Sequence, residues 1–152
     1  MPSMPETALG TFLATFAFSV AGGIIPFLSI EAFVLALSVA SPHADLLPVA
    51  LAASLGQMAA KSLVYLTGRG VVRLPLRRTG DRLRAVSARL ARVDGGAMAV
   101  VLTSAVTSLP PFYAVSLAAG ALRLRFGRFF AVGWAGAFLR FAAVFTLPRL
   151  LP

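Results

Sequence analysis

The chain has 152 residues, of which 59% are hydrophobic and only 12% are charged, and its net charge is +9. Soluble domains contain roughly 45–50% apolar and about 25% charged residues, so this composition indicates an integral membrane protein. The chain has no cysteine, which excludes disulfides and thiolate metal sites, and we expect neither a metal nor a cofactor.

The first two apolar segments, residues 8–22 and 27–40, are each too short to cross a bilayer. The breaker cluster GGIIP, which ends at Pro26, separates them. Neither flank carries Lys or Arg, so neither flank is expected in the cytoplasm. We therefore expect a re-entrant hairpin with its apex at Pro26.

Residues 47–67 are long enough to span, because about 20 helical residues cross a 30 Å hydrocarbon core. Polar side chains recur on this segment at steps of three and four, which puts them on one helix face: Ser54, Gln57, Lys61 and Tyr65. A parallel row of small residues lets another helix approach closely. We expect the polar face to line an interior cavity. Snorkelling of Lys61 towards the interface is the alternative.

Eight of the fourteen basic residues lie between Arg69 and Arg92. An arginine cluster between apolar segments is typical of a cytoplasmic loop. No DNA- or RNA-binding motif accompanies it, so we do not expect a nucleic-acid partner. Within the cluster, residues 79–94 are amphipathic and predict a helix on the membrane surface. Its contacts with anionic headgroups would be Arg82, Arg89 and Arg92.

The apolar segment 97–122 carries two adjacent prolines near its middle, Pro110 and Pro111, and arginines follow it at 123–128. If this segment crossed the membrane, one arginine cluster would lie outside the cell. A hairpin keeps both clusters in the cytoplasm. Because proline has no N–H, an apex at these residues exposes fewer unsatisfied donors at membrane depth. Residues 129–147 are the last candidate span.

The predicted fold class is an all-α integral membrane protein with one domain over residues 1–152. Its first half (8–67) and second half (97–148) would form an inverted repeat of hairpin plus spanning helix, joined by a basic cytoplasmic linker (69–95). We expect a multi-pass protein of the cell membrane that can form a homo-oligomer. The alternative is an ordinary bundle of four or five kinked helices.

Three charged residues lie inside apolar segments: Glu31, Lys61 and Arg140. A charge near the bilayer centre costs at least ~2.5–3.5 kcal/mol on insertion scales, so each of them calls for a function. Lys61 and Arg140 can hold a phosphate headgroup, and a guanidinium does so bidentately. Glu31 either lies in a helix first turn capped by Ser29, pairs with a cation, or takes up a proton. We find no nucleophile–base pair or metal-ligand cluster, so we do not expect an enzyme.

Four stretches carry a resemblance to a known family: GGIIPFLSIEAF (22–33), LGQMAAKSLVYLTGRG (55–70), TSLPPFYAVSLAAGAL (107–122) and GWAGAFLRF (133–141). In this order they resemble the DedA family of membrane proteins, also called the VTT or SNARE-associated domain family. The resemblance implies two opposed re-entrant hairpins and lipid movement between leaflets. It maps the membrane-embedded acidic residue of the family onto Glu31. The chain departs from the pattern at Gln57, where many members have an acidic residue, and lacks their Arg-Phe-x-Pro motif near the second hairpin.

The expected function is therefore a flippase or scramblase for an anionic lipid, an anionic phospholipid or more specifically a polyprenyl phosphate. A membrane scaffold that binds anionic lipid or a partner protein through helix 79–94 is the alternative from a different class. Export of cationic drugs ranks lowest, because the embedded cations outnumber the one embedded carboxylate.

Overall fold

The computed structural model describes residues 4–25, 28–70, 88 and 96–151, and its regular structure over these residues is entirely α-helical. The helices are α1 (Met4–Ile24), α2 (Ile30–Ala40), α3 (Leu46–Gly68), α5 (Ala97–Thr107), α6 (Phe112–Ala121) and α7 (Phe126–Leu150). The prediction of an all-helical chain is confirmed. The predicted apex at Pro26 and the amphipathic segment 79–94, with Arg82, Arg89 and Arg92, lie outside the described residues.

Two helices in the described part of the chain are long and apolar enough to cross a membrane, namely α3 and α7. They include the two spans predicted at 47–67 and 129–147. The other apolar helices are shorter.

The chain divides into two compact units. The first unit (residues 1–60 and 137–152) contains α1, α2, most of α3 and the last part of α7. The second unit (residues 61–136) contains the end of α3, then α5, α6 and the first part of α7. These units differ from the two sequence halves, because each long helix contributes a segment to both.

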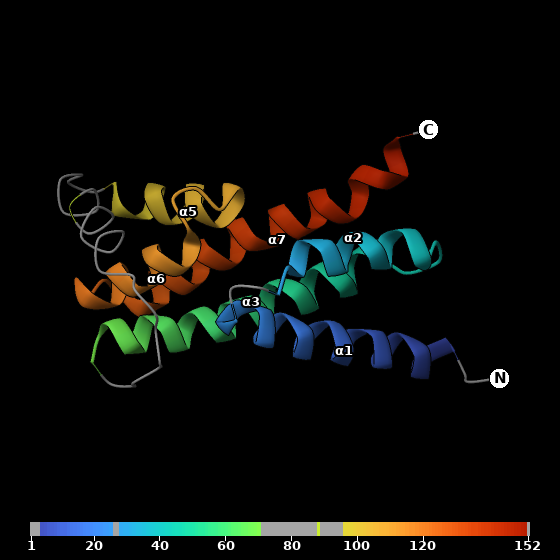
Figure 1. Ribbon diagram of the computed structural model, residues 1–152, viewed down its shortest axis with the longest axis horizontal. Helices are drawn as coiled ribbons and strands as arrows, with labels where there is room; N and C mark the ends of the chain where they lie inside the picture. The colour runs from blue at the N-terminus through green and yellow to red at the C-terminus, as the bar shows by residue number, and fades with distance from the viewer. Residues whose placement is uncertain (1–3, 26–27, 71–87, 89–95, 152) are drawn as a thin grey trace. The chain divides into compact units, whose positions relative to one another are not determined.

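In the first unit, α1 and α2 lie side by side as an antiparallel pair (Figure 1). The rings of Phe18 and Phe33 stack between them with centroids 4.4 Å apart. The core that fixes α2 against the long helices consists of Ile30, Val34, Val49, Ala53, Ala137, Phe141 and Phe145. Burial of these apolar side chains holds the start of α3, the end of α7 and α2 together within this unit.

Helix α2 begins with a side-chain cap. The Ser29 hydroxyl oxygen accepts a hydrogen bond from the Ala32 backbone N–H at 3.1 Å, and Glu31 lies in the first turn. A cap of this kind satisfies an N–H that the helix itself leaves unpaired, and a first-turn carboxylate interacts favourably with the helix dipole. Of the alternatives that the sequence left open for Glu31, the first turn capped by Ser29 is thus present in the structure.

In the second unit, α5 and α6 are joined by a turn at residues 108–111, where the two prolines predicted it. Ser108 has a left-handed backbone with φ of 60°. The Ser104 hydroxyl donates to the Pro110 carbonyl oxygen at 2.5 Å, and the Thr107 hydroxyl oxygen accepts from the Leu109 backbone N–H at 3.2 Å. Hydroxyl groups of α5 therefore form hydrogen bonds with backbone polar groups of the turn. Irregular backbone away from water requires such partners.

The end of α3 packs closely on α6 through two glycines. A Cβ on Gly68 would overlap the Leu117 carbonyl oxygen, and a Cβ on Gly120 would overlap the Tyr65 carbonyl oxygen. Only glycine lets the two backbones approach this closely.

Candidate functional site

The clearest polar cluster in the first unit surrounds Arg140, which lies in the middle of α7 and is only 8% exposed. Its Nη2 donates a hydrogen bond to the Gln57 Oε1 on α3 at 2.5 Å. The same nitrogen lies 3.5 Å from the Glu31 Oε1 on α2. Three helices thus each contribute one polar side chain, and we call Glu31, Gln57 and Arg140 the Arg140 cluster.

The two partners of Arg140 hold it differently. The contact with the Gln57 amide is short, whereas the 3.5 Å separation from Glu31 is longer than the 2.7–2.9 Å typical of a charge-assisted hydrogen bond. The Glu31 side chain is 40% exposed, and its second oxygen lies 3.5 Å from the Ser29 hydroxyl. Gln57 therefore fixes the guanidinium, while the Glu31 carboxylate stands at the open side of the cluster.

The ring of Phe141 also contacts this cation, with the Arg140 guanidinium carbon 4.9 Å from its centroid. Cation–π attraction adds a contact that orients the guanidinium without neutralising its charge. Besides the Glu31 carboxylate, Arg140 thus contacts an amide and an aromatic ring, neither of which carries a charge.

The sequence singled out Glu31 and Arg140 separately and left the partner of Glu31 open. It did not identify Gln57 as the hydrogen-bond partner of Arg140. The signal for that role is the place of Gln57 in the polar face of residues 54–65, which the sequence assigned to a cavity.

Lys61 belongs to the second unit and is 6% exposed. Its Nζ lies 5.3 Å from the centroid of the Tyr113 ring, in the first turn of α6. This distance is within the range of a cation–π interaction. A joint phosphate site of Lys61 and Arg140 remains a prediction, because these residues belong to the two units that are described separately.

Two other members of the polar face are buried and hydrogen-bonded within the protein. The Ser54 hydroxyl donates to the Leu51 carbonyl oxygen at 3.1 Å. The Tyr65 hydroxyl donates to the Leu124 carbonyl oxygen, and the Tyr65 ring stacks on Phe129 at 5.1 Å. Their role in lining a cavity stays a prediction.

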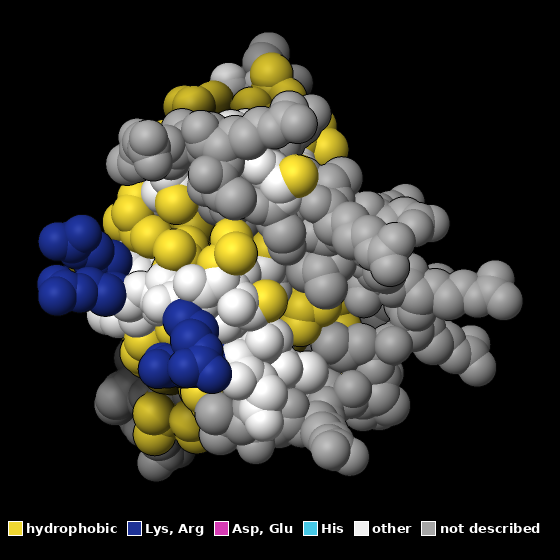
Figure 2. Space-filling model, turned by 90° about the vertical axis from the view of Figure 1, so that its left-hand side faces the viewer, with side chains coloured by type: hydrophobic (Ala, Val, Ile, Leu, Met, Phe, Trp, Pro, Cys, Tyr) yellow, Lys and Arg dark blue, Asp and Glu magenta, His cyan; other side chains and the backbone are white. Residues whose placement is uncertain are grey.

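The described basic residues of the second unit gather near the end of α3 and the start of α7. Arg69 Nη1 donates to the Tyr65 hydroxyl at 3.4 Å, so Arg69 lies at the same end of this unit as Leu124. The exposed arginines beside Leu124 are Arg123, Arg125 and Arg128. Figure 2 shows basic side chains standing out on this face, and no acidic side chain among the described residues drawn there. Arg69, the described member of the first arginine cluster, thus lies at the same end of this unit as the second cluster.

Comparison with known proteins adds one finding. A family model described as VTT domain matches residues 25–148, a range that includes the whole Arg140 cluster and the prolines Pro26, Pro110 and Pro111. Neither a curated protein nor a solved structure matches the chain. Since the match covers most of the chain, and the helices and their order agree with the resemblance found in the sequence, the chain belongs to the VTT domain family, the DedA family of membrane proteins.

Proposed function

We propose that this protein moves an anionic lipid between the leaflets of the membrane and that Arg140 binds the phosphate of the lipid headgroup. The observation that carries the proposal is a buried guanidinium in the middle of a spanning helix, fixed by a neutral amide and only loosely paired with a carboxylate. A buried charge of this kind is costly in a membrane and is a functional-site hypothesis by default.

Phosphate binding would proceed by exchange of anions on Arg140. A phosphate monoester offers several oxygens to the planar guanidinium and can accept two parallel hydrogen bonds, which the 3.5 Å contact with Glu31 does not provide. The phosphate would displace Glu31, whose partial exposure gives it room to move away. Return of Glu31 to Arg140 would then release the lipid.

Gln57 is central to this exchange because it holds Arg140 without neutralising it. A carboxylate at this position would compete with the phosphate in both states of the cycle. The neutral amide keeps the guanidinium in place during the exchange and leaves its charge for the incoming anion.

The two units support the proposed inverted repeat by their internal correspondence. Helix α3 begins at Leu46 and α7 at Phe126, so equivalent positions of the long helices differ by about 80 residues. At one such pair, a Cβ on Gly56 would lie 2.6 Å from the Phe16 carbonyl oxygen on α1, and a Cβ on Gly136 would lie 2.6 Å from the Ala105 Cβ on α5. Each glycine therefore admits the first helix of the hairpin in its own unit.

A second pair of equivalent positions lies at the ends of the long helices. Arg149 Nη2 on α7 donates to the Ser41 and Ala44 carbonyl oxygens, both at 3.1 Å, in the connection between α2 and α3. Arg69 at the end of α3 reaches the connection between α6 and α7 through the Tyr65 hydroxyl. In each unit an arginine at the end of a long helix contacts the loop that follows the hairpin. This correspondence is expected of an inverted repeat.

The chemistry of the cluster and the family support the proposed lipid class. The guanidinium favours a phosphate, and the expected polyprenyl phosphate carries its phosphate directly on an apolar chain. Transport of such a lipid requires no bond to be made or broken by the protein.

The test is movement of a fluorescent polyprenyl phosphate in vesicles that contain the purified protein. Arg140→Ala should slow lipid movement by about tenfold or more, which corresponds to one charge-assisted hydrogen bond. Arg149→Ala is the matched control, because it removes an arginine from the same helix that binds loop carbonyls rather than the cluster. Equal rates in Arg140→Ala and the wild type would disprove the assignment.

Gln57→Glu adds a second arm to the test. A second carboxylate beside Arg140 should reduce phosphate binding and slow transport, while preserving or raising thermal stability. Gln57→Leu removes the hydrogen bond from Arg140 and should lower both the transport rate and the thermal stability. A variant set in which stability and transport always fall together would favour a structural role for Gln57 instead.

A further inference from the structure

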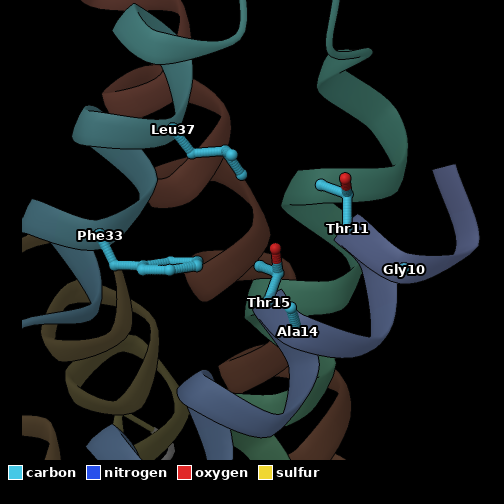
Figure 3. Close-up of a pocket in the computed structure, with 6 residues that line it drawn as sticks. All are labelled: Gly10, Thr11, Ala14, Thr15, Phe33 and Leu37. Atoms are coloured by element: carbon cyan, nitrogen blue, oxygen red, sulfur yellow. The ribbon is translucent and has the colours of Figure 1, made fainter. Parts of the chain in front are cut away.

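A pocket of about 430 Å³ lies in the first unit between α1 and α2, open to the outside (Figure 3). Its lining residues are Gly10, Thr11, Ala14, Thr15, Phe33 and Leu37. Figure 3 shows the two threonines of α1 on one wall and Phe33 and Leu37 of α2 on the other. No residue of the Arg140 cluster is among those that line it, so this pocket is a separate site.

The Thr15 hydroxyl is the unusual group in this wall. Thr15 is fully buried, and in the described part of the chain its hydroxyl has no hydrogen-bond partner. Three other helical threonines donate to the carbonyl oxygen four residues earlier: Thr67 to Leu63, Thr107 to Thr103 and Thr146 to Ala142. Thr15 lacks this bond, although its helix continues on both sides.

A buried hydroxyl without a partner is unfavourable, and within a bilayer there is no water to supply one. In Figure 3 the Thr15 oxygen points into the space between Thr11 and Leu37. A ligand that offers a hydrogen-bond acceptor at this point would satisfy it.

The surroundings of the pocket define the rest of that ligand. Large apolar side chains are exposed on both helices that form it: Leu9 and Leu13 on α1, and Leu35 and Val39 on α2. In a protein of a membrane family, such a surface contacts the hydrocarbon chains of lipids. In a bilayer, a pocket with these surroundings would be open to lipid chains.

We propose that this pocket binds one acyl chain of a glycerophospholipid, with the ester carbonyl of that chain accepting a hydrogen bond from Thr15. The ester carbonyl is the acceptor at the start of every acyl chain, and the methylene groups after it suit the Phe33 and Leu37 wall. A polyprenyl chain has no carbonyl, so the transported lipid proposed above does not fit this chemistry. The bound phospholipid would be a structural lipid that seals the first hairpin.

Photo-crosslinking tests the site directly. The protein is reconstituted with a phosphatidylglycerol that carries a diazirine on its acyl chain, and the labelled peptides are mapped by mass spectrometry. We expect labels on α1 and α2 around the pocket. Gly10→Phe should reduce them by at least about fivefold by filling the pocket, because nothing lies within 4 Å of a Cβ at Gly10. Gly10→Leu should give an intermediate reduction.

The matched control for bulk is Gly127→Phe, since nothing lies within 4 Å of a Cβ at Gly127 either and this residue belongs to the second unit. For the hydroxyl, Thr15→Val should lower labelling by the ester-linked probe by about fivefold, the factor expected of one neutral hydrogen bond. It should leave labelling by an ether-linked probe unchanged. Thr146 donates its hydroxyl to a carbonyl oxygen in its own helix, so Thr146→Val is the control and should label like the wild type.

Three outcomes would overturn the proposal: labels in Gly10→Phe equal to those in the wild type, equal labelling of the wild type by ester- and ether-linked probes, or stronger labelling of the pocket by a polyprenyl phosphate probe. Arg140→Ala should label like the wild type. Failure of the transport proposal would therefore leave this result unchanged, and the two ideas are tested separately.

Discussion

The Tyr65 hydroxyl, on the last turns of α3, donates a hydrogen bond to the carbonyl oxygen of Leu124, just before α7. Arg69 donates to the same hydroxyl oxygen. This relationship brings the basic end of α3 to the basic start of α7 within the second unit. Whether α5 and α6 return to the side of the membrane from which they start stays a prediction, which the last experiment below tests.

Tyr65→Phe should destabilise the protein. The change keeps the ring that stacks on Phe129 but leaves the Leu124 carbonyl oxygen without its partner. We expect the free energy of unfolding to fall by about 1–3 kcal/mol, the range for an unsatisfied buried polar group. Thermal unfolding in detergent measures it. Tyr113→Phe, which keeps the ring facing Lys61, is the control and should unfold close to the wild type.

Gly120→Ala should disrupt the contact between α3 and α6. The added Cβ would overlap the Tyr65 backbone carbonyl, which cannot rotate away as a flexible side chain can. Overpacking of this kind typically costs about 1–3 kcal/mol or more, and it outweighs the gain of up to about 1 kcal/mol from better helix propensity. The thermal midpoint of Gly120→Ala should therefore fall.

Gly127→Ala isolates the propensity term, because a Cβ at Gly127 meets nothing within 4 Å. Its thermal midpoint should stay the same or rise. A Gly120→Ala protein that is as stable as Gly127→Ala would contradict the close approach of α3 and α6.

Much of the fold was predictable because it depends on local chemistry. Apolar length identified α3 and α7, and the prolines located the turn between α5 and α6. The ends of α7 were less predictable: it runs from Phe126 to Leu150 rather than over 129–147, with Pro148 inside its last turn. Apolarity marks the part of a helix that suits hydrocarbon, and it does not mark where the helical backbone ends.

The site was only partly predictable, because it depends on which helices meet. The cost of a buried charge identified Glu31 and Arg140 from the sequence. Helix spacing put Gln57 and Tyr65 on one face but gave no partners for them. The structure separates their contacts, since Gln57 bonds Arg140 in the first unit and Tyr65 bonds the Leu124 carbonyl in the second. Tertiary partners of this kind lie far apart in the sequence and follow no short motif.

Lys61 provides a test of whether one cation or two serve the lipid phosphate. Under the two-cation hypothesis, Lys61→Ala should slow transport of polyprenyl phosphate by about tenfold, the effect of losing one charge-assisted contact. Lys61→Arg should retain most of the activity, because arginine keeps the charge and also stacks on aromatic rings such as Tyr113. Transport by Lys61→Ala at the wild-type rate, together with an inactive Arg140→Ala, would leave Arg140 as the phosphate ligand on its own.

The topology can be tested with single cysteines, because the chain contains none of its own. Arg69→Cys places a thiol at an exposed position after α3, and Gly127→Cys places one at the exposed start of α7. The hydrogen bond between Tyr65 and Leu124 brings these two helix ends together. His43→Cys places a thiol in the exposed connection between α2 and α3. A membrane-impermeant maleimide should label the first two from the cytoplasmic side only and the third from the opposite side only. The reason is the positive-inside rule, which retains both arginine clusters in the cytoplasm and thereby requires α5 and α6 to enter and leave by the same face. Labelling of Arg69→Cys and Gly127→Cys from opposite sides would mean that α5 and α6 cross the bilayer, and α7 would then run in the reverse direction.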